Sequence, residues 1–599
     1  MIAADVHAGE MKLLWGDTHL HSSLSSDAYQ FRNRSITPDL AYRYAKGFPV
    51  VHPYTKSRIR ISRPLDFLAV TDHAEWLGEV PSVILKDPKA ARELIEMVLE
   101  EDGTDQVEDR ITELMLPTWS HLPSPMYTDA FNFDAWEEII DAAEDHYSPG
   151  EFTTLIGWEW TASPGLTQHR VVLTSAGGDK ARAITPLSAL ECRGEGICTY
   201  GSPEDLWNWL EETSKKEDMD FVAIPHNPNL SRGTAFPLGA SDGSAIDAAY
   251  AQRRMRWEPV IEVTQVKGDS EADPVLSATD EFAAFEKFGA TASQYSTRER
   301  EVAAGSFARS GLRRGLEFQK TIGANPYKFG LSGATDSHTG LTGSGEDDFQ
   351  GKFGTDSIPA LKDTPLWPGI ADWRGWQYSA SGLTAVWTRG NSREEIVAAL
   401  KRKEVYATTG TRIRLQFFAG WSFVPEHAEQ TSLFDVGYDL GVPMGGDLLA
   451  APVRNGQPLR PTFLIRAIKD PVGANLDRVQ IVKGWVDDHG DSHERVYDVA
   501  WSHGRSVDRK GSPEPVGNTV DLATGRYANT IGAPNLSVVW TDPEFNHSQP
   551  AFYYVRVLEI PTPRHSLHDA IALRIDPAET KRPATIQERA YSSPIWYTP

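Results

Sequence analysis

The sequence predicts an α/β barrel followed by an all-β, sandwich-like domain, and three observations lead to that fold class. Several short apolar segments each end in charged or histidine side chains, as buried strands of a parallel sheet do. Helical patterns lie between these segments, which favours an α/β architecture. Beyond about residue 411 the sequence changes to short alternating segments separated by turns rich in Pro, Gly and Asp.

The predicted strands of the first domain share one design, a run of mostly apolar residues followed at once by a polar group. In an α/β barrel the strand ends and their loops form the reactive face, so polar groups placed in this way converge there. We therefore expect one site to which all of these strands contribute. The strands are residues 12–19, 65–73, 152–159, 221–226, 259–263 and 330–336.

Helices are predicted between these strands. Residues 90–101 and 204–216 have helical patterns, and the second is preceded by Ser202-Pro-Glu-Asp, a good helix start. Ser392 and Glu395 form a capping-box pattern, so a further helix is expected from there to about residue 403.

The C-terminal part is predicted to be an antiparallel β-sandwich. Its expected strands include residues 412–417, 462–467, 478–483 and 552–557. We place the domain boundary near residues 410–415, which gives a barrel domain over 1–411 and a sandwich-like domain over 412–599. No internal repeat indicates a propeller or a solenoid.

Composition and charge limit the kinds of partner. The 599 residues exceed what one hydrophobic core organises, and 40% of them are hydrophobic, so a globular chain of two or three domains is expected. The net charge of −24 argues against binding along a nucleic-acid backbone. No apolar stretch is long enough to span a membrane, and the N-terminus lacks a basic leader with an apolar core. Any anionic substrate therefore has to meet local cations, and the oligomeric state stays open.

Cys192 and Cys198 are the only cysteines, and they lie in a glycine-containing loop. They are close enough to form a small disulfide in an oxidising compartment, which would place the protein in the periplasm or outside the cell. Two free thiols in the cytoplasm are equally consistent with the sequence.

Five short motifs carry most of the residues that could bind a metal. Side chains two apart on a strand point the same way, so His19 with His21, and Asp336 with His338, can each hold one cluster of cations. The other motifs supply the remaining imidazoles and carboxylates. Such an N/O ligand set without thiolates suits catalytic Zn²⁺, Mn²⁺ or Fe. These motifs are Thr-Asp72-His73, Trp-Glu159-Trp and Pro-His226-Asn.

In their order these motifs resemble the polymerase-and-histidinol-phosphatase (PHP) superfamily of metal-dependent phosphoesterases. Gly-Asp-Thr-His-Leu-His-Ser-Ser at residues 16–23, Glu-Trp-Thr at 159–161 and Tyr-Ala-Thr-Thr-Gly at 406–410 are similar to its large bacterial DUF3604 branch. The resemblance covers roughly residues 13–411. It implies a distorted seven-stranded barrel that holds two or three metal ions.

The resemblance also implies how the ligands are shared. One metal would be held by His19, His21, Glu159 and Asp336. Glu159 would bridge to a second metal, bound by the residues His169 and His226. A third ion would lie between Asp27, His73 and His338; superfamily members often have histidine where this chain has Asp27, which leaves the identity of the metal and the occupancy of that site open.

The expected chemistry is attack by a metal-bridging hydroxide, because two cations lower the pKa of a shared water. The general acid stays open between Asp27, His338 and a water. The expected contacts to the ester's non-bridging oxygens are Arg170, Arg232 and Lys267, each weighed against an ordinary salt bridge. We interpret Asp17 and Asp72 either as groups that orient imidazoles or as structural caps. Glu262 and Glu271 are interpreted first as solvated loop carboxylates, with support of the site as the alternative.

The predicted function is therefore hydrolysis of phosphoric mono- or diesters of small molecules. A sulfate ester or phosphotriester hydrolase with the same metal site is the closest alternative. A metal-stabilised binding protein is another, with Trp485, Trp501 and Trp540 as platforms for a carbohydrate or partner. An amidase or lactonase is disfavoured because no lysine lies on a strand near Glu159.

Overall fold

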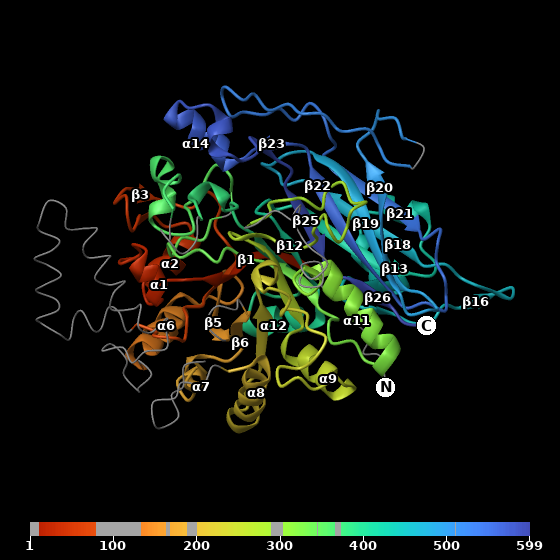
Figure 1. The fold of residues 1–599 in the computed structure, drawn as a ribbon, viewed down its shortest axis with the longest axis horizontal. Helices are drawn as coiled ribbons and strands as arrows, with labels where there is room; N and C mark the ends of the chain where they lie inside the picture. The colour runs from red at the N-terminus through yellow and green to blue at the C-terminus, as the bar shows by residue number, and fades with distance from the viewer. Residues whose placement is uncertain are drawn as a thin grey trace, which may run out of the picture.

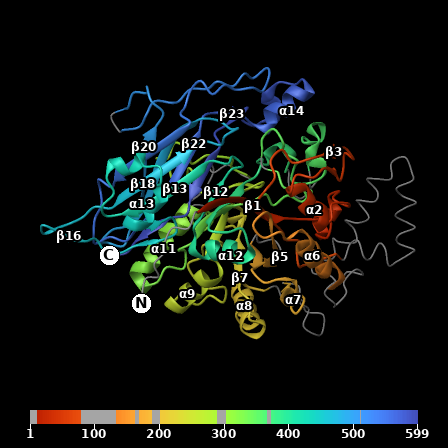
Figure 2. The same cartoon turned by 180° about the vertical axis from the view of Figure 1, so that it is seen from behind.

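A computed structural model describes residues 11–78, 133–162, 168–188, 201–288, 303–343, 345–365, 373–508 and 511–599. The protein is a mixed α/β protein built on a 13-stranded sheet, with smaller sheets beside it. Figures 1 and 2 show the helices α6 (Phe133–His146), α7 (Gly178–Ala181), α8 (Pro203–Glu217) and α9 (Ala248–Trp257) on one side and the C-terminal strands on the other.

Seven strands from the first part of the chain surround the region in which the candidate ligands lie. They are β1 (Lys12–Leu20), β4 (Phe67–Val70), β5 (Thr153–Ala162), β6 (Gln168–Thr174), β7 (Phe221–Pro225), β8 (Val260–Gln265) and β10 (Gly330–Gly333). β1, β4 and β5 are parallel neighbours, and β8 is parallel to β10. Six of the seven were predicted; β6 was not.

The prediction of a barrel is only partly confirmed, because the described strands form no closed barrel. β7 ends the hydrogen-bonded order of the large sheet, whereas β8 and β10 form a separate sheet with β9 (Gly268–Asp269). β7 lies beside β8, and the residues that follow β10 meet the end of β1 through an isolated bridge between Leu20 and Ser337. β6 runs antiparallel between β5 and β7, so the run of strands is not uniformly parallel.

Two predicted helices are confirmed, and their caps explain where they begin. α8 starts after Ser202, whose side chain accepts a hydrogen bond from the backbone N–H of Asp205. α12 (Arg393–Arg402) starts after Ser392, which accepts from the N–H of Glu395 in the same way. The helix predicted for residues 90–101 lies outside the described residues. The remaining helices of this part are α1 (Ser26–Gln30), α2 (Pro38–Ala45) and α11 (Ala308–Ile322).

The C-terminal part is mainly β-structure in two facing sheets. One sheet contains β13 (Arg414–Gly420), β14 (Gly441–Pro443), β18 (Thr462–Ile468) and β21 (Asn535–Thr541). The other contains β19 (Leu476–Val486), β20 (Ser492–Trp501), β22 (Ala551–Glu559), β25 (Arg589–Ser592) and β26 (Ile595–Tyr597). The rings of Phe463 and Tyr553, one from each sheet, lie 4.5 Å apart. Two helices, α13 (Leu433–Leu440) and α14 (His565–Leu573), accompany the strands.

Hydrogen bonding continues across the predicted domain boundary. β1 pairs with β11 (Leu383–Thr388), β11 pairs with β12 (Val405–Thr408), and β12 pairs with β25 of the C-terminal part. The large sheet thus joins both ends of the chain, and the division at residues 411 and 412 stays a prediction.

Short two-stranded ribbons complete the description: β2 (Val50–Val51) with β3 (Arg58–Ile59), β16 (Val453–Arg454) with β17 (Gln457–Pro458), and β23 (Thr562–Pro563) with β24 (Thr585–Ile586). β15 (Asp447–Leu448) ends the large sheet.

No helix in the described part of the chain is long and apolar enough to cross a membrane.

A cavity of about 540 Å³ lies between the two parts of the chain and is lined by buried carboxylates, among them Glu559 and Glu588. Burial raises the pKa of Glu559 to about 8, and the nearby Asp470 adds to this effect, although Thr411 donates a hydrogen bond to the carboxylate. The folded protein therefore keeps a proton on Glu559 at pH values where the unfolded chain has lost it.

Replacing Glu559 by glutamine is expected to stabilise the protein at pH 8. Because the folded-state pKa is raised, the wild type loses stability as the pH rises from about 4.5 toward 8, and the variant lacks this loss. The expected gain is on the order of 3 kcal/mol at pH 8 and close to zero at pH 4.5. Urea unfolding at both pH values measures it. Glu426→Gln, at an exposed position, is the control. If the free energy of unfolding depended on pH equally in both variants, the prediction would be refuted.

Candidate metal centre

The candidate ligands converge although they come from widely separated segments. His19 and His21 lie at the end of β1, Glu159 on β5, and His169 on β6. The backbone fixes their register: the N–H of Asp336 donates to the carbonyl of His19, and the N–H of Glu159 to the carbonyl of Asp72. The sequence prediction that strand ends bring these side chains to one place agrees with this geometry.

Four overlapping groups of side chains could each hold a metal ion, with ligand atoms within 4.8 Å of one another. His19, His21, His73 and Glu159 each belong to two of these groups. The groups therefore share ligands, as the ions of a multinuclear centre do. They are His19/His21/Asp336, His19/Glu159/His226, His73/Glu159/His169, and His21/Asp27/His73/His338.

Glu159 lies at the middle of the cluster, and its two carboxylate oxygens face different histidines. Oε1 lies 2.6 Å from Nδ1 of His169 and 2.8 Å from Nε2 of His226. Oε2 lies 3.0 Å from Nε2 of His21 and 3.2 Å from Nε2 of His19. Burial alone would raise the pKa of Glu159, but His73 and His226 hold it well below its usual range. An ionised carboxylate with this geometry can bridge two cations.

The donor set fits divalent ions. Nε2 of His19 and Nε2 of His21 face each other at 3.1 Å, and both lie within 3.5 Å of Oδ1 of Asp336. Burial lowers the pKa of His226, whose Nδ1 is buried without a hydrogen-bond partner, and so favours the neutral ring that binds metals.

The cluster attracts positive charge strongly. Burial alone would lower the pKa of His19, but Asp336, Glu262 and Glu159 outweigh it and raise the pKa to about 10. A proton on His19 thus stands where a cation would bind. A divalent ion that binds here has to displace such protons, so uptake of metal should release protons.

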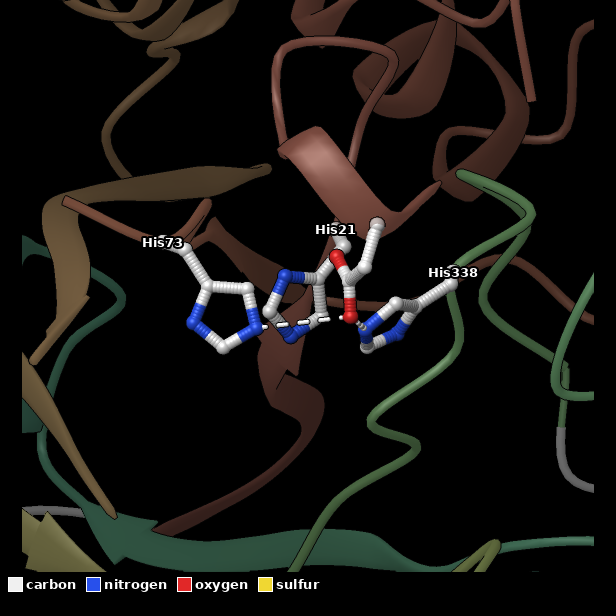
Figure 3. A group of neighbouring side chains, drawn as sticks. His21, His73 and His338 are labelled. Carbon is white, nitrogen blue, oxygen red and sulfur yellow. Dashed lines mark hydrogen bonds and ion pairs between the residues drawn. The ribbon is translucent and has the colours of Figure 1, made fainter. Parts of the chain in front are cut away.

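Asp27 reaches the cluster from helix α1 and takes part in the fourth group. Its Oδ2 lies 2.7 Å from Nε2 of His338 and 3.6 Å from Nε2 of His73. Figure 3 shows the imidazole rings of His21, His73 and His338 converging from three separate segments. The side chain of Asp27 is 20% exposed and that of His73 is 14% exposed, so this side of the cluster is open to solvent.

Asp336 is held by cationic and amide groups. Nζ of Lys267 lies 2.5 Å from Oδ2, and Nζ of Lys352 lies 2.6 Å from Oδ1. Gln265 donates a hydrogen bond of 2.8 Å to Oδ2. Burial would raise the pKa of Asp336, yet the two lysines hold it well below its usual range. Its backbone φ of 52° lies in the left-handed region, which is strained for a residue with a side chain.

Sequence reasoning missed or misread several residues of the site. Glu262 is buried on β8, with Oε2 at 3.2 Å from Nδ1 of His19, so the interpretation as a solvated loop carboxylate was wrong. Lys352 also donates to Nδ1 of His338 at 2.7 Å, and no motif in its loop indicated this. Ser25 Oγ lies 2.7 Å from Nδ1 of His21, and Thr161 Oγ1 lies 3.2 Å from Nδ1 of His73.

The structure brings Lys267 to the cluster and turns Arg170 away from it. Arg170 follows His169 on β6 and therefore points to the other face, where Nε donates to Glu258 at 2.9 Å. The side chain of Arg232 is exposed and forms no ion pair within the described residues. Its contact with an ester at the cluster stays a prediction.

Asp17 and Asp72 act as structural caps in this geometry. Asp17 accepts hydrogen bonds from the N–H groups of Thr335 and His19. Asp72 accepts two from Ser22, each of 2.6 Å. Within the described residues neither carboxylate forms a hydrogen bond with an imidazole. Asp72, however, also bonds to Ser25, whose Oγ lies 2.7 Å from Nδ1 of His21, so it can help to orient that ring. Cys192 and Cys198 lie outside the described residues.

The comparisons with known proteins identify a family. The model of a family described as "Protein of unknown function (DUF3604)" matches residues 8–599, which include the C-terminal part. No curated protein matches the chain. Among solved structures, it is similar to a two-domain protein from Bacteroides vulgatus that contains a predicted PHP-like metal-dependent phosphoesterase. The identity is 11%, with 89% of this chain and 95% of the other covered, and the TM-score of 0.29 is too low to bear on fold or function.

Proposed function

Because this chain belongs to the DUF3604 family over nearly its whole length, a family whose name assigns no activity, we propose from its site that it is a metal-dependent hydrolase of phosphoric esters. The observation that carries the proposal is Glu159, a buried carboxylate whose two oxygens face two pairs of imidazoles at 2.6 to 3.2 Å. A structural site is closed by its ligands, whereas this cluster has exposed members on one side.

Two or three divalent ions would be held by the nine residues of the four groups, with Glu159 shared between two ions. Oxygen and nitrogen ligands suit Mn²⁺, Zn²⁺ or Fe. Such ions supply a nucleophile at neutral pH and stabilise the charge of an oxyanion. The ligands are His19, His21, Asp27, His73, Glu159, His169, His226, Asp336 and His338.

The charge of the site favours an anionic substrate. Four carboxylates, those of Asp27, Glu159, Glu262 and Asp336, are set against the ammonium groups of Lys267 and Lys352. The protein groups alone thus carry an excess of two negative charges, which two divalent ions would outweigh, so that the loaded site has a net positive charge. In a chain with a net charge of −24 this is where an anionic ester would bind.

The protein groups on the open side have separate tasks in this proposal. Lys267, whose side chain is 16% exposed, holds an ester oxygen with its ammonium group. Where no third ion lies between them, the contact of 2.7 Å between Nε2 of His338 and Oδ2 of Asp27 would provide a path for a proton to the leaving group; with an ion bound there, a water would serve instead. Lys352 is buried and positions Asp336 and His338 without reaching solvent.

Hydrolysis of a panel of para-nitrophenyl esters tests the function. Phosphate, bis-phosphate, sulfate and acetate esters should be compared before and after chelation and after addition of Mn²⁺, Zn²⁺ or Fe²⁺. We expect cleavage of a phosphate ester that chelation abolishes and metal restores. Preference for the sulfate ester would replace the substrate class but keep the site. Bound metal without turnover of any ester would support the alternative of a metal-stabilised binding protein.

Replacing Lys267 by alanine is expected to raise KM for a phosphate ester about tenfold and to lower kcat less. The reason is that the ammonium group contacts the bound oxyanion, and a charged hydrogen bond of this kind contributes roughly 1.5–3 kcal/mol. Steady-state kinetics measure the change. Lys328→Ala is the matched control, because Lys328 pairs with Asp447 outside the cluster. Unchanged KM in Lys267→Ala would contradict the assignment.

A further inference from the structure

The segment of residues 267–288 connects the candidate metal centre with the C-terminal strands. It begins at Lys267, whose Nζ contacts Asp336, and continues through β9. Lys267 itself is the second residue of a tight turn between β8 and β9, in which Gln265 pairs with Gly268. Gly268 has a φ of 88°, and a Cβ there would lie 2.5 Å from the carbonyl oxygen of Glu286. The turn that presents Lys267 is thus packed against the far end of the same segment.

The first half of the segment is held by buried tyrosine and arginine side chains. Tyr591 of β25 donates a hydrogen bond of 2.8 Å from its hydroxyl to Oδ2 of Asp269. Tyr554 of β22 donates to Oε1 of Glu271, and Arg556 donates to Oε2 at 3.2 Å. Glu271 is buried in this network, so the expectation of a solvated loop carboxylate was wrong.

The second half is held by C-terminal arginines. Arg556 binds both oxygens of Asp280, at 2.9 Å and 2.6 Å. Arg564 binds both oxygens of Glu286, at 3.0 Å and 2.8 Å. Paired contacts of this kind fix direction as well as distance, so each arginine determines the orientation of its carboxylate.

These contacts are costly to lose because they are buried. Arg556, Arg564 and Tyr591 are fully buried, as are Asp269 and Glu271. A buried carboxylate that loses its cation is left with an uncompensated charge. Arg309 on α11, which packs against β19, also contacts Glu271 and Asp280, and its NH1 reaches Glu494 of β20. Figure 1 shows α11 running beside these C-terminal strands.

We propose that the C-terminal strands hold the segment of residues 267–288 against the candidate metal centre, so that Tyr591 and Arg556 are positioning residues for Lys267. The proposal rests on the proposed function in one respect, namely that Lys267 binds an anion. It gives the C-terminal part a role in the site that no ligand motif indicates, because none of its residues belongs to the metal-ligand groups of the described structure.

Hydrogen–deuterium exchange of the full chain tests whether the C-terminal strands hold the segment. In Tyr591→Phe, the amides of residues 268–270 should exchange roughly tenfold faster, since one hydrogen bond to a carboxylate is lost. Tyr597→Phe is the matched control, because its hydroxyl donates to the carbonyl of His547 and not to the segment. Equal exchange of residues 268–270 in the wild type and in Tyr591→Phe would overturn the proposal.

Binding of inorganic phosphate to the metal-loaded protein tests whether the effect passes through Lys267. Calorimetry should show a Kd about tenfold higher in Arg556→Met than in the wild type. In the Lys267→Ala background the same substitution should change Kd less than about twofold. An equal change in both backgrounds would mean a general loss of structure and would overturn the positioning role.

Two further comparisons keep this test decisive. Arg505→Met removes another C-terminal arginine, one that contacts Asp477 instead of the segment, and should leave phosphate binding unchanged. If Arg556→Met does not fold, Tyr591→Phe replaces it in the same cycle, with an expected change of about threefold. Absence of phosphate binding by the wild type would count against the proposed function, whereas the exchange result still decides whether the C-terminal strands hold the segment.

Discussion

Glu159→Gln is expected to lower hydrolysis of a phosphate ester roughly a thousandfold or more and to release at least one metal ion. The amide keeps the size of the side chain but loses the negative charge that two cations would share. Both carboxylate oxygens are in use, one toward His169 and His226 and the other toward His19 and His21. Kinetics and elemental analysis of the purified variant measure the two effects.

The fold should survive this substitution, which separates a loss of chemistry from a loss of structure. Without metal, Glu159 is a buried anion among imidazoles, and glutamine can still bond to them. Far-ultraviolet circular dichroism and the unfolding midpoint, both measured after removal of metal from the two proteins, should therefore stay close to those of the wild type. Glu559→Gln, another buried carboxylate that belongs to none of the metal-ligand groups, should retain full activity. Full activity of Glu159→Gln would exclude the bridging role.

The second large effect is expected for Glu262→Gln, in which metal affinity should fall by roughly 10- to 100-fold. Oε2 of Glu262 lies 3.2 Å from Nδ1 of His19, and both side chains are fully buried. A carboxylate in this place accepts a hydrogen bond from Nδ1–H of His19. The other ring nitrogen, Nε2, is then free to bind the metal. Glutamine can still accept that hydrogen bond but lacks the charge that makes the imidazole a stronger ligand.

Competition with a metal-binding dye measures the affinity, and the absorption spectrum of the Co²⁺ form reports the ligand geometry. We expect weaker binding with a similar spectrum in Glu262→Gln. Glu262→Ala should weaken binding further and change the spectrum, because the ring of His19 is then free to turn. Metal affinity equal to that of the wild type in both variants would show that Glu262 only fills space. Glu559→Gln serves again as the control with unchanged affinity.

Much of the candidate site could be predicted because strand geometry leaves a clear trace in a sequence. Residues two apart on a strand share a face, so His19 and His21 were placed together correctly before any fold was known. The DUF3604 branch, named from the motifs alone, is confirmed by the family match. His169 was predicted only through the family resemblance, since β6 begins with polar residues and was not recognised as a strand.

The rest of the site depends on contacts between distant segments. Lys352 lies in a loop without regular structure, and only the folded chain brings it within 2.7 Å of His338. For Glu262 the sequence favours a solvated carboxylate over one that supports the site, because a strand end does not reveal whether another segment covers it. The arginine at position 170 was expected at the site from its place beside His169, whereas strand alternation turns it to the opposite face.

The same limit applies to the fold. Local patterns located six of the seven strands around the site, but the pairing of β12 with β25 joins residues that are far apart in the chain. No local pattern encodes such a pairing, so the continuity of one sheet through both parts could not be predicted from the sequence. Register and sheet order are set by packing over the whole molecule.

Anomalous diffraction at the Mn, Fe and Zn absorption edges, from crystals of the protein purified without added chelator, tests the central claim most directly. The account predicts two or three peaks among the ligand atoms of the four groups. Two of these peaks should lie next to the Glu159 carboxylate, one on each side of it. A chain with no peak there, or with a single peak enclosed by four protein ligands, would contradict a multinuclear catalytic centre.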